Sequence, residues 1–334
     1  MRSVFSESMK VVQFGSGRPP GGAEGWRAVT RVLRSYADRL LNDSVTTIFP
    51  DDCTICNRPL TAWSSTPICT SCVERVAPQT GMLCNICGEV LAMESARFGT
   101  ALGMNSCTEC RLAPPDFARA VAFATYEDEM REMLHLLKYE HMLRLASTQL
   151  GKWMAEAVLL LEPDAGSDLI VVAVPLFPAR EAQRGFNQSV LLADAAVARL
   201  RKLRPLWKLT TQHGALKRVK DTEAQFALSA RARRKNLRAA FQVSEAAAVR
   251  GREVLLIDDI LTTGATAREC SRVLIRAGAA KVWVATLARA QAESIVAGAR
   301  DVAMWDVSEP GVATGFVQSA RINERTTETT ATSL

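Results

Sequence analysis

The chain of 334 residues is 48% hydrophobic and 23% charged, which is typical of folded globular proteins and excludes a chain that is disordered throughout. No apolar run approaches the roughly 18 residues that a membrane-spanning helix needs, so we expect no membrane span. The first residues lack the basic, apolar and small-residue segments of a secretory signal. The sequence therefore predicts a cytoplasmic protein.

The net charge of +6 is distributed unevenly along the chain. Residues 178–252 contain 17 Lys and Arg against 5 Asp and Glu, so this segment carries a net charge of +12. Such a concentration of cations indicates a partner that is an anion. The phosphates of a small molecule and those of nucleic acid both fit this charge.

Five regions follow one another in the sequence. Residues 1–25 are rich in Gly, Pro and Ser and predict a disordered leader, and residues 26–50 have the apolar spacing of an amphipathic helix. Residues 51–115 contain eight of the nine cysteines. In residues 116–305 short apolar runs alternate with helical patterns, which predicts an α/β domain with a parallel sheet. Residues 306–334 predict a disordered tail.

Within the α/β region, the apolar patterns predict strands and helices in alternation. We expect strands at residues 118–126, 168–174, 253–257 and 281–287, and helices at residues 127–139, 142–161, 187–200 and 266–277. Residues 208–238 have few apolar side chains and predict no strand. Lys138 and Tyr139 end the first of these helices, where a solvated cation is the ordinary expectation.

The cysteines form four Cys-x-x-Cys pairs, with 12 residues between the first two pairs and 19 between the last two. These spacings are typical of zinc ribbons, and four thiolates without an open position form a structural site. We predict two structural Zn²⁺ ions, with iron–sulfur ligation as the main alternative and an interleaved pairing also open. The ninth cysteine, Cys270, is predicted to be a buried apolar residue. The predicted metal ligands are Cys53, Cys56, Cys69, Cys72, Cys84, Cys87, Cys107 and Cys110.

The stretch 254–266 carries the strongest signal for a ligand site. An apolar run ends at Asp258 and Asp259, and a short turn rich in threonine then opens a helix. Backbone N–H groups at a helix start bind phosphate, while carboxylates accept hydrogen bonds from sugar hydroxyls or hold a divalent ion. No lysine follows the glycine, so the turn is not a Walker A loop. The pattern predicts a ribose 5-phosphate site whose phosphate loop is Thr262, Thr263, Gly264, Ala265 and Thr266.

This stretch resembles the phosphoribosyl pyrophosphate (PRPP) signature of type I phosphoribosyltransferases, and the whole chain resembles the ComF family of competence-associated proteins. The likeness is carried by the cysteine pairs and by residues 137–139, 172–176, 180–188, 218–225, 234–236, 258–266 and 287–289. It implies an α/β fold, namely a type I phosphoribosyltransferase-like parallel sheet with flanking helices. A small double zinc-ribbon module would precede this sheet.

The resemblance also implies roles for individual residues. Asp258 and Asp259 would contact the ribose hydroxyls, and the loop 262–266 would hold the 5-phosphate. Arg184 would join the two aspartates as a catalytic group by supplying positive charge. Residues 208–238 resemble, by position, the flexible hood that closes over the reacting ribose. The remaining PRPP-binding residues would be Val174, Pro175 and Leu176 of the pyrophosphate loop, with Arg180, Arg218 and Lys220.

Two functions fit this resemblance. The first is Mg²⁺-dependent transfer of a phosphoribosyl group from PRPP to an unidentified acceptor, with release of pyrophosphate. The alternative is a non-catalytic accessory factor for DNA uptake or DNA processing that keeps only PRPP binding and docks on a helicase partner through the ribbons. Direct contact with single-stranded DNA is disfavoured, because residues 208–238 offer only Phe226 for stacking on a base.

Overall fold

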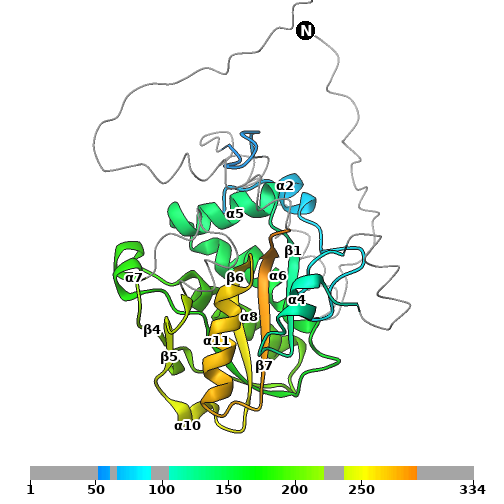
Figure 1. The fold of residues 1–334 in the computed structure, drawn as a ribbon. Coiled ribbons are helices and arrows are strands. Elements are labelled where there is room, and N and C mark those ends of the chain that lie inside the picture. The colour runs from blue at the N-terminus through cyan, green and yellow to red at the C-terminus, as the bar shows by residue number, and fades with distance from the viewer. Residues whose placement is uncertain (1–51, 61–65, 92–104, 222–236, 292–334) are drawn as a thin grey trace, which may run out of the picture.

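The computed structural model describes residues 52–60, 66–91, 105–221 and 237–291 (Figure 1). The predicted leader, the predicted helix at 26–50 and the predicted tail lie outside these residues, as does the part of the predicted hood at 222–236. Among the described helices, none combines the length and the apolar composition that crossing a bilayer requires.

A five-stranded sheet forms the centre of the molecule. Its strands are β1 (Arg119–Thr125), β2 (Asp168–Ala173), β3 (Lys208–Thr211), β6 (Glu253–Leu261) and β7 (Lys281–Arg289), in the order β1-β7-β6-β2-β3. All neighbouring pairs are parallel, which confirms the predicted parallel α/β sheet. Because the five strands are parallel, the loop after β6 lies at the carboxyl edge of the sheet, where open α/β sheets bind their ligands.

The predicted helices are present with shifts of a few residues. They are α5 (Asp128–Tyr139), α6 (Gly151–Leu159), α8 (Gln188–Leu203) and α11 (Ala265–Arg276). The helix expected at 142–161 is not uniform, because a π-helical turn at Ala146–Leu150 precedes α6. The shorter helices are α2 (Thr70–Arg75), α4 (Thr108–Leu112), α7 (Pro178–Arg184) and α10 (Ala246–Val249).

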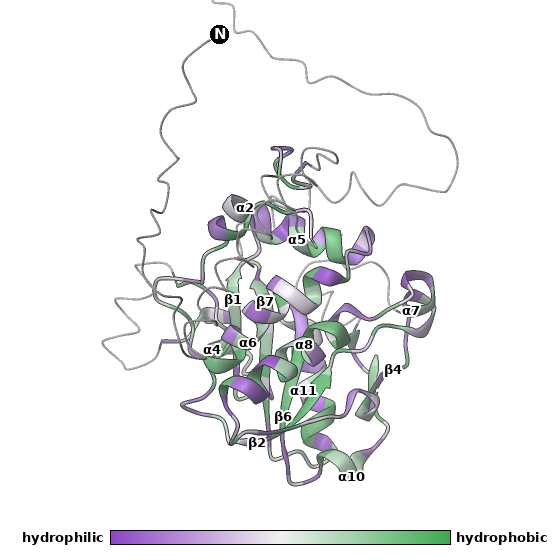
Figure 2. Ribbon diagram, turned by 180° about the vertical axis from the view of Figure 1, so that it is seen from behind, coloured by the Kyte–Doolittle hydropathy of each residue, from purple (hydrophilic) through white to green (hydrophobic). Residues whose placement is uncertain are grey.

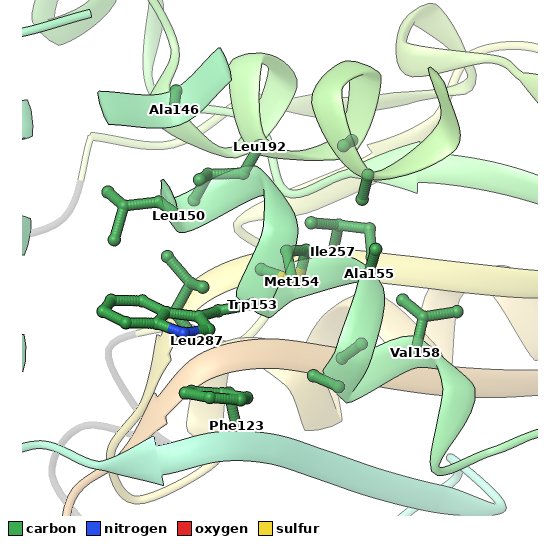
Figure 3. Close-up of a cluster of buried hydrophobic side chains, with 14 of the residues drawn as sticks. Phe123, Ala146, Leu150, Trp153, Met154, Ala155, Val158, Leu192, Ile257 and Leu287 are labelled. Carbon is green, nitrogen blue, oxygen red and sulfur yellow. The ribbon is translucent and has the colours of Figure 1, made fainter. Parts of the chain in front are cut away.

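Each face of the sheet has its own hydrophobic core, because side chains alternate along the strands. Leu169 and Val171 of β2 belong to the core shared with α6 and α8, whereas Ile170 and Val172 belong to the core shared with α11. Figure 3 shows the first core, where the rings of Phe123 and Trp153 stack with centroids 5.2 Å apart. The strands are mostly hydrophobic (Figure 2), as burial on both faces requires.

The expectation that residues 208–238 contain no strand was wrong. β3 lies at the edge of the main sheet, and β4 (Leu216–Arg218) pairs antiparallel with β5 (Phe241–Val243). The apolar signal was weak because β3 has four residues and β4 three, and each buries a single side chain. The part of the predicted hood at 222–236 lies outside the described residues.

Gly151, the first residue of α6, lies at a close approach to α8. A Cβ atom at this position would lie 2.6 Å from the Cβ atom of Ala195 in α8 and would also collide with the backbone oxygen of Ala146. We therefore expect Gly151→Ala to lower the free energy of unfolding by about 1–3 kcal/mol through overpacking. Urea unfolding followed by circular dichroism measures this change.

The control for this substitution is Gly214→Ala. A Cβ atom at Gly214 would meet only the side chain of Glu245, at 3.7 Å. We expect a change within about 0.5 kcal/mol for this exposed position. An equal loss of stability in both variants would contradict the close approach of α6 and α8.

Candidate functional site

The two aspartates lie near the C-terminal end of β6, and their carboxyl groups have different partners. Asp258 Oδ1 accepts hydrogen bonds from Ser189 Oγ at 3.0 Å and from the backbone N–H of Asp259 at 2.9 Å. Asp259 is buried and forms an ion pair with Lys138 of α5. The end of α5, the start of α8 and these two residues of β6 therefore meet at one end of the central strand.

Burial dominates the protonation of this pair. Burial raises the pKa of Asp258 to about 8, and the neighbouring charge of Asp259 adds to the effect. Burial alone would lower the pKa of Lys138, but the attraction and the hydrogen bond of Asp259 outweigh it and the pKa is raised. At neutral pH the site therefore holds a protonated Asp258 beside a Lys138–Asp259 ion pair.

The expectation of a solvated Lys138 was wrong. Its side chain is only 18% exposed, because the C-terminal end of α5 lies against the end of β6. Position at a helix end predicted an exposed cation and carried no information about this distant carboxylate. The one pointer was the segment 137–139, which belongs to the family resemblance. Ser189, one residue beyond another such segment, was also missed.

The predicted phosphate loop forms the start of α11. Gly264 is its N-cap residue with φ +72°, a left-handed conformation that side chains rarely adopt, which explains the glycine. Because glycine has no side chain, the N-cap residue does not cap the first N–H groups of α11. Thr263 Oγ1 is buried and has no hydrogen-bond partner among the described residues. A buried hydroxyl without a partner is costly, and a bound phosphate would satisfy it.

The predicted pyrophosphate loop, Val174–Leu176, follows β2 at the same edge of the sheet. The side-chain amide of Asn187 donates to the backbone oxygen of Val174 at 3.0 Å. The backbone N–H of Ala173 donates to His213 Nδ1 at 3.2 Å. Asn187 and Ser189, at the start of α8, therefore tie this loop and Asp258 to one element.

The predicted cations have three different surroundings. Arg184 donates to Gln188 Oε1 at 2.8 Å and lies 5.5 Å from the centre of the Tyr139 ring, so it borders the acidic pair without contacting it. Burial lowers the pKa of Arg218, and the nearby charge of Arg180 lowers it further. Arg180 lies 3.9 Å from Asp221, and the charge of this carboxylate partly offsets the repulsion between the two arginines. The remaining predicted cation, Lys220, is exposed.

The cysteines form two separate tetrads, which excludes the interleaved pairing. We call Cys53, Cys56, Cys69 and Cys72 the first tetrad, and Cys84, Cys87, Cys107 and Cys110 the second tetrad. The sulfurs of each tetrad lie within 4.8 Å of one another, and the second and third cysteines are 3.6 Å apart in both, as Cys56–Cys69 and as Cys87–Cys107. Four ligands about 2.3 Å from a tetrahedral Zn²⁺ have similar separations, so both tetrads fit zinc.

The two tetrads repeat one local design. The backbone N–H of Cys69 donates to Cys53 Sγ at 3.3 Å, and that of Cys107 donates to Cys84 Sγ at the same distance. A short helix begins directly after each of these donors, namely α2 and α4. The residue after the second cysteine of each unit, Asn57 or Gly88, has positive φ. The two tetrads therefore share a backbone design as well as the Cys-x-x-Cys spacing.

Comparison with known proteins supports both parts of the chain. The double zinc ribbon domain family matches residues 44–111, and the phosphoribosyl transferase domain family matches residues 188–323. DNA utilization protein YhgH of Salmonella typhimurium is 34% identical over 242 residues, which are 72% of this chain and 97% of that protein. Competence protein F of Haemophilus influenzae is 27% identical over 231 residues, 67% of this chain and 90% of that protein.

The chain belongs to the ComF family. A more distant ComF relative, Competence protein ComFC of Bacillus subtilis, is 26% identical over 229 residues, 66% of this chain and 84% of that protein. Membership confirms the expected combination of a double zinc ribbon with a phosphoribosyltransferase-like sheet. The roles of individual site residues stay predictions.

The raised pKa of Asp258 makes stability depend on pH. The pKa of an aspartate in the unfolded chain is about 3.9. Between that pH and about 8 the folded state holds an extra proton, so the free energy of unfolding falls as pH rises through this window. Asp258→Asn does not titrate. We expect its free energy of unfolding, relative to the parent protein, to rise by about 1–2 kcal/mol from pH 6 to pH 8.

Urea unfolding of both zinc-loaded proteins at several pH values measures this difference, and the pH dependence of metal binding cancels in the comparison. Asp116→Asn, at an exposed position, is the matched control and should give a flat difference. A flat difference for Asp258→Asn would show that Asp258 is ionised in the folded protein.

The ion pair of Lys138 predicts a second stability effect. Lys138→Gln leaves Asp259 buried without its cation, and we expect a loss of about 2 kcal/mol at pH 8. The double variant Lys138→Gln with Asp259→Asn should recover part of this loss, because the uncompensated charge is gone. Additive losses in urea unfolding would argue against a direct pair, and Lys202→Gln, at an exposed position, is the control.

Proposed function

We propose that the chain binds PRPP at the carboxyl edge of β6 and transfers its phosphoribosyl group to an acceptor with release of pyrophosphate. One observation carries this proposal: the Asp258–Asp259 pair leads directly into a phosphate loop whose buried Thr263 hydroxyl has no partner among the described residues. The diol and the 5-phosphate of a ribose 5-phosphate lie on one small sugar and match these two neighbouring recognition elements. The phosphoribosyl transferase domain match at 188–323 includes both.

In this proposal, each group of the site has a defined task. A protonated Asp258 both donates to and accepts from a ribose hydroxyl, and Asp259 accepts from the neighbouring hydroxyl. The bond between ribose C1 and the pyrophosphate oxygen breaks, and the leaving oxygen keeps the electron pair. The acceptor's lone pair forms the new bond at C1, and the acceptor loses its proton to solvent or base. Arg180, Arg184 and Arg218 favour the departing negative charge.

The acidic pair fits sugar hydroxyls better than a metal ion. Asp258 holds a proton and Asp259 is paired with Lys138, so neither offers a free carboxylate. Within the described ranges, the groups of three or more possible metal ligands are the two cysteine tetrads. Mg²⁺ would therefore enter with the pyrophosphate of PRPP, where it neutralises the leaving group.

The names of the relatives favour a second candidate function. DNA utilization protein and Competence protein are names for DNA handling, which fits an accessory factor that binds PRPP without turnover. In that case the zinc ribbons would dock on a helicase or another DNA-processing protein. Both candidates require the same PRPP site.

Calorimetric titration of the zinc-loaded full chain with PRPP and Mg²⁺ tests the proposal. We expect saturable binding by the parent protein and by the Asp116→Asn control. The double variant Asp258→Asn with Asp259→Asn should bind at least about tenfold more weakly, because two hydrogen-bonded contacts are altered. Absence of binding by the parent protein would refute the site, and unchanged binding by the double variant would place it elsewhere.

Release of pyrophosphate then separates the two candidates. A transferase should release pyrophosphate from PRPP when an acceptor-containing cell extract is added, and the double variant should not. An accessory factor should bind PRPP and release none above the level of the extract alone. A coupled phosphate assay with inorganic pyrophosphatase measures this difference.

A further inference from the structure

Arg289, the last residue of β7, joins the second tetrad to the phosphate loop. It is 6% exposed, and its Nη1 atom donates to the backbone oxygens of Leu261, at 3.1 Å, and of Thr262. Its Nε atom donates to the backbone oxygen of Cys87 at 3.3 Å, and Nη2 lies 4.0 Å from Cys87 Sγ. One buried guanidinium thus holds a metal-binding knuckle and the first residues of the phosphate loop together.

Arg268 makes the same connection from the other end of the loop. It lies in the first turn of α11, where its backbone N–H donates to the oxygen of Gly264 at 2.9 Å. Its guanidinium donates to the backbone oxygen of Ala113 and lies 3.8 Å from Cys110 Sγ. The loop 262–266 is therefore flanked on both sides by arginines that contact the second tetrad.

The second tetrad is also part of the domain core. Its four cysteines belong to the hydrophobic core beneath α11, together with Ala267 and Leu274 of that helix. The backbone N–H of Ala120 in β1 donates to the oxygen of Ile86 at 2.7 Å, between the first two ligands. A Cβ atom at Gly88 would lie 3.3 Å from the oxygen of Ala120, so this knuckle is pressed against the sheet.

The first tetrad is placed differently. Its buried members, Cys53 and Cys72, belong to the other core, on the face of the sheet that packs against α6 and α8. Arg75, at the end of α2, forms an ion pair with Glu129 in the first turn of α5. Glu129 lies at the opposite end of α5 from Lys138. The guanidinium of Arg75 donates to Glu129 and to Cys72 Sγ, and neither of these residues lies in the loop 262–266.

We infer that the second zinc site is a structural part of the phosphate site, and that Arg289 and Arg268 are positioning residues that couple metal occupancy of the second tetrad to the geometry of the loop 262–266. What the loop binds rests on the proposed function, whereas the link between metal and loop does not. Loss of the second metal releases Cys87 and Cys110, and with them the Arg289 guanidinium that binds Thr262 and the Arg268 guanidinium that anchors the first turn of α11. Because such coupling is reciprocal, a phosphate ligand strengthens the hold of the second tetrad on its metal.

Hydrogen exchange of the zinc-loaded full chain tests the link without any ligand. We expect amide exchange in residues 260–268 to accelerate about tenfold in Cys110→Ser and in Arg289→Lys, since lysine lacks the fork that reaches several acceptors. Cys69→Ser, the matched control at the first tetrad, should lose one metal ion and leave this segment unchanged. Peptides of β2 and α8 serve as the measure of an intact fold.

Arg268→Gln keeps every cysteine and Arg289, so it preserves the test if Cys110→Ser or Arg289→Lys fails to fold. Unchanged exchange at 260–268 in folded Arg289→Lys and Arg268→Gln would overturn the inference. Equal acceleration in Cys69→Ser would also overturn it, because the effect would then follow from zinc loss in general.

Zinc release adds the reciprocal measurement. A chromogenic chelator should remove zinc from the parent protein in two phases, which Cys69→Ser and Cys110→Ser assign to the two tetrads. Ribose 5-phosphate should slow the phase of the second tetrad several-fold and should leave the first unchanged. In Arg289→Lys this protection should be lost. If the exchange result holds and neither PRPP nor ribose 5-phosphate binds, the proposed function fails while the link between metal and loop stands.

Discussion

Two neighbouring carboxyl groups at the end of a buried strand impose the central constraint on this molecule. Burial disfavours the ionised form of Asp258, and the neighbouring charge of Asp259 disfavours it further. The raised pKa of Asp258 favours its protonated form, while Asp259 forms an ion pair with Lys138. The C-terminal end of α5 must therefore reach β6, and the start of α8 must bring Ser189 to Asp258. The ends of two helices thus supply the cation and the hydroxyl that the acidic pair requires.

The sheet was largely predictable because burial on both faces leaves continuous apolar runs in β2, β6 and β7. The runs at 168–174 and 281–287 differ from the observed strands by one or two residues. The predicted end of β6 at residue 257 was too early, since Asp258 and Asp259 interrupt the apolar pattern while the strand continues to Leu261. β3 escaped prediction because an edge strand with one buried residue, Leu209, leaves almost no pattern.

The site was predictable only where its residues are contiguous. The acidic pair and the phosphate loop occupy nine successive positions, and the cysteines have a spacing that the metal itself requires. Lys138, Ser189 and Arg289 reach the same site from 27 or more residues away in the sequence, so their roles are set by tertiary packing. A helix-end lysine or a strand-end arginine has many ordinary surroundings, and the sequence near it does not distinguish them.

The chain contains nine cysteines, and their placement determines how it meets an oxidant. Cys270 and all four sulfurs of the second tetrad belong to buried residues, whereas Cys56 and Cys69 of the first tetrad are partly exposed. With both tetrads filled by metal, oxidising agents reach the thiolates of the first ribbon before any other. Oxidative damage would therefore expel zinc from the ribbon that lies outside the phosphate site and spare the one built into it. The two tetrads thus differ as an outer metal centre that meets an oxidant first and an inner, protected one.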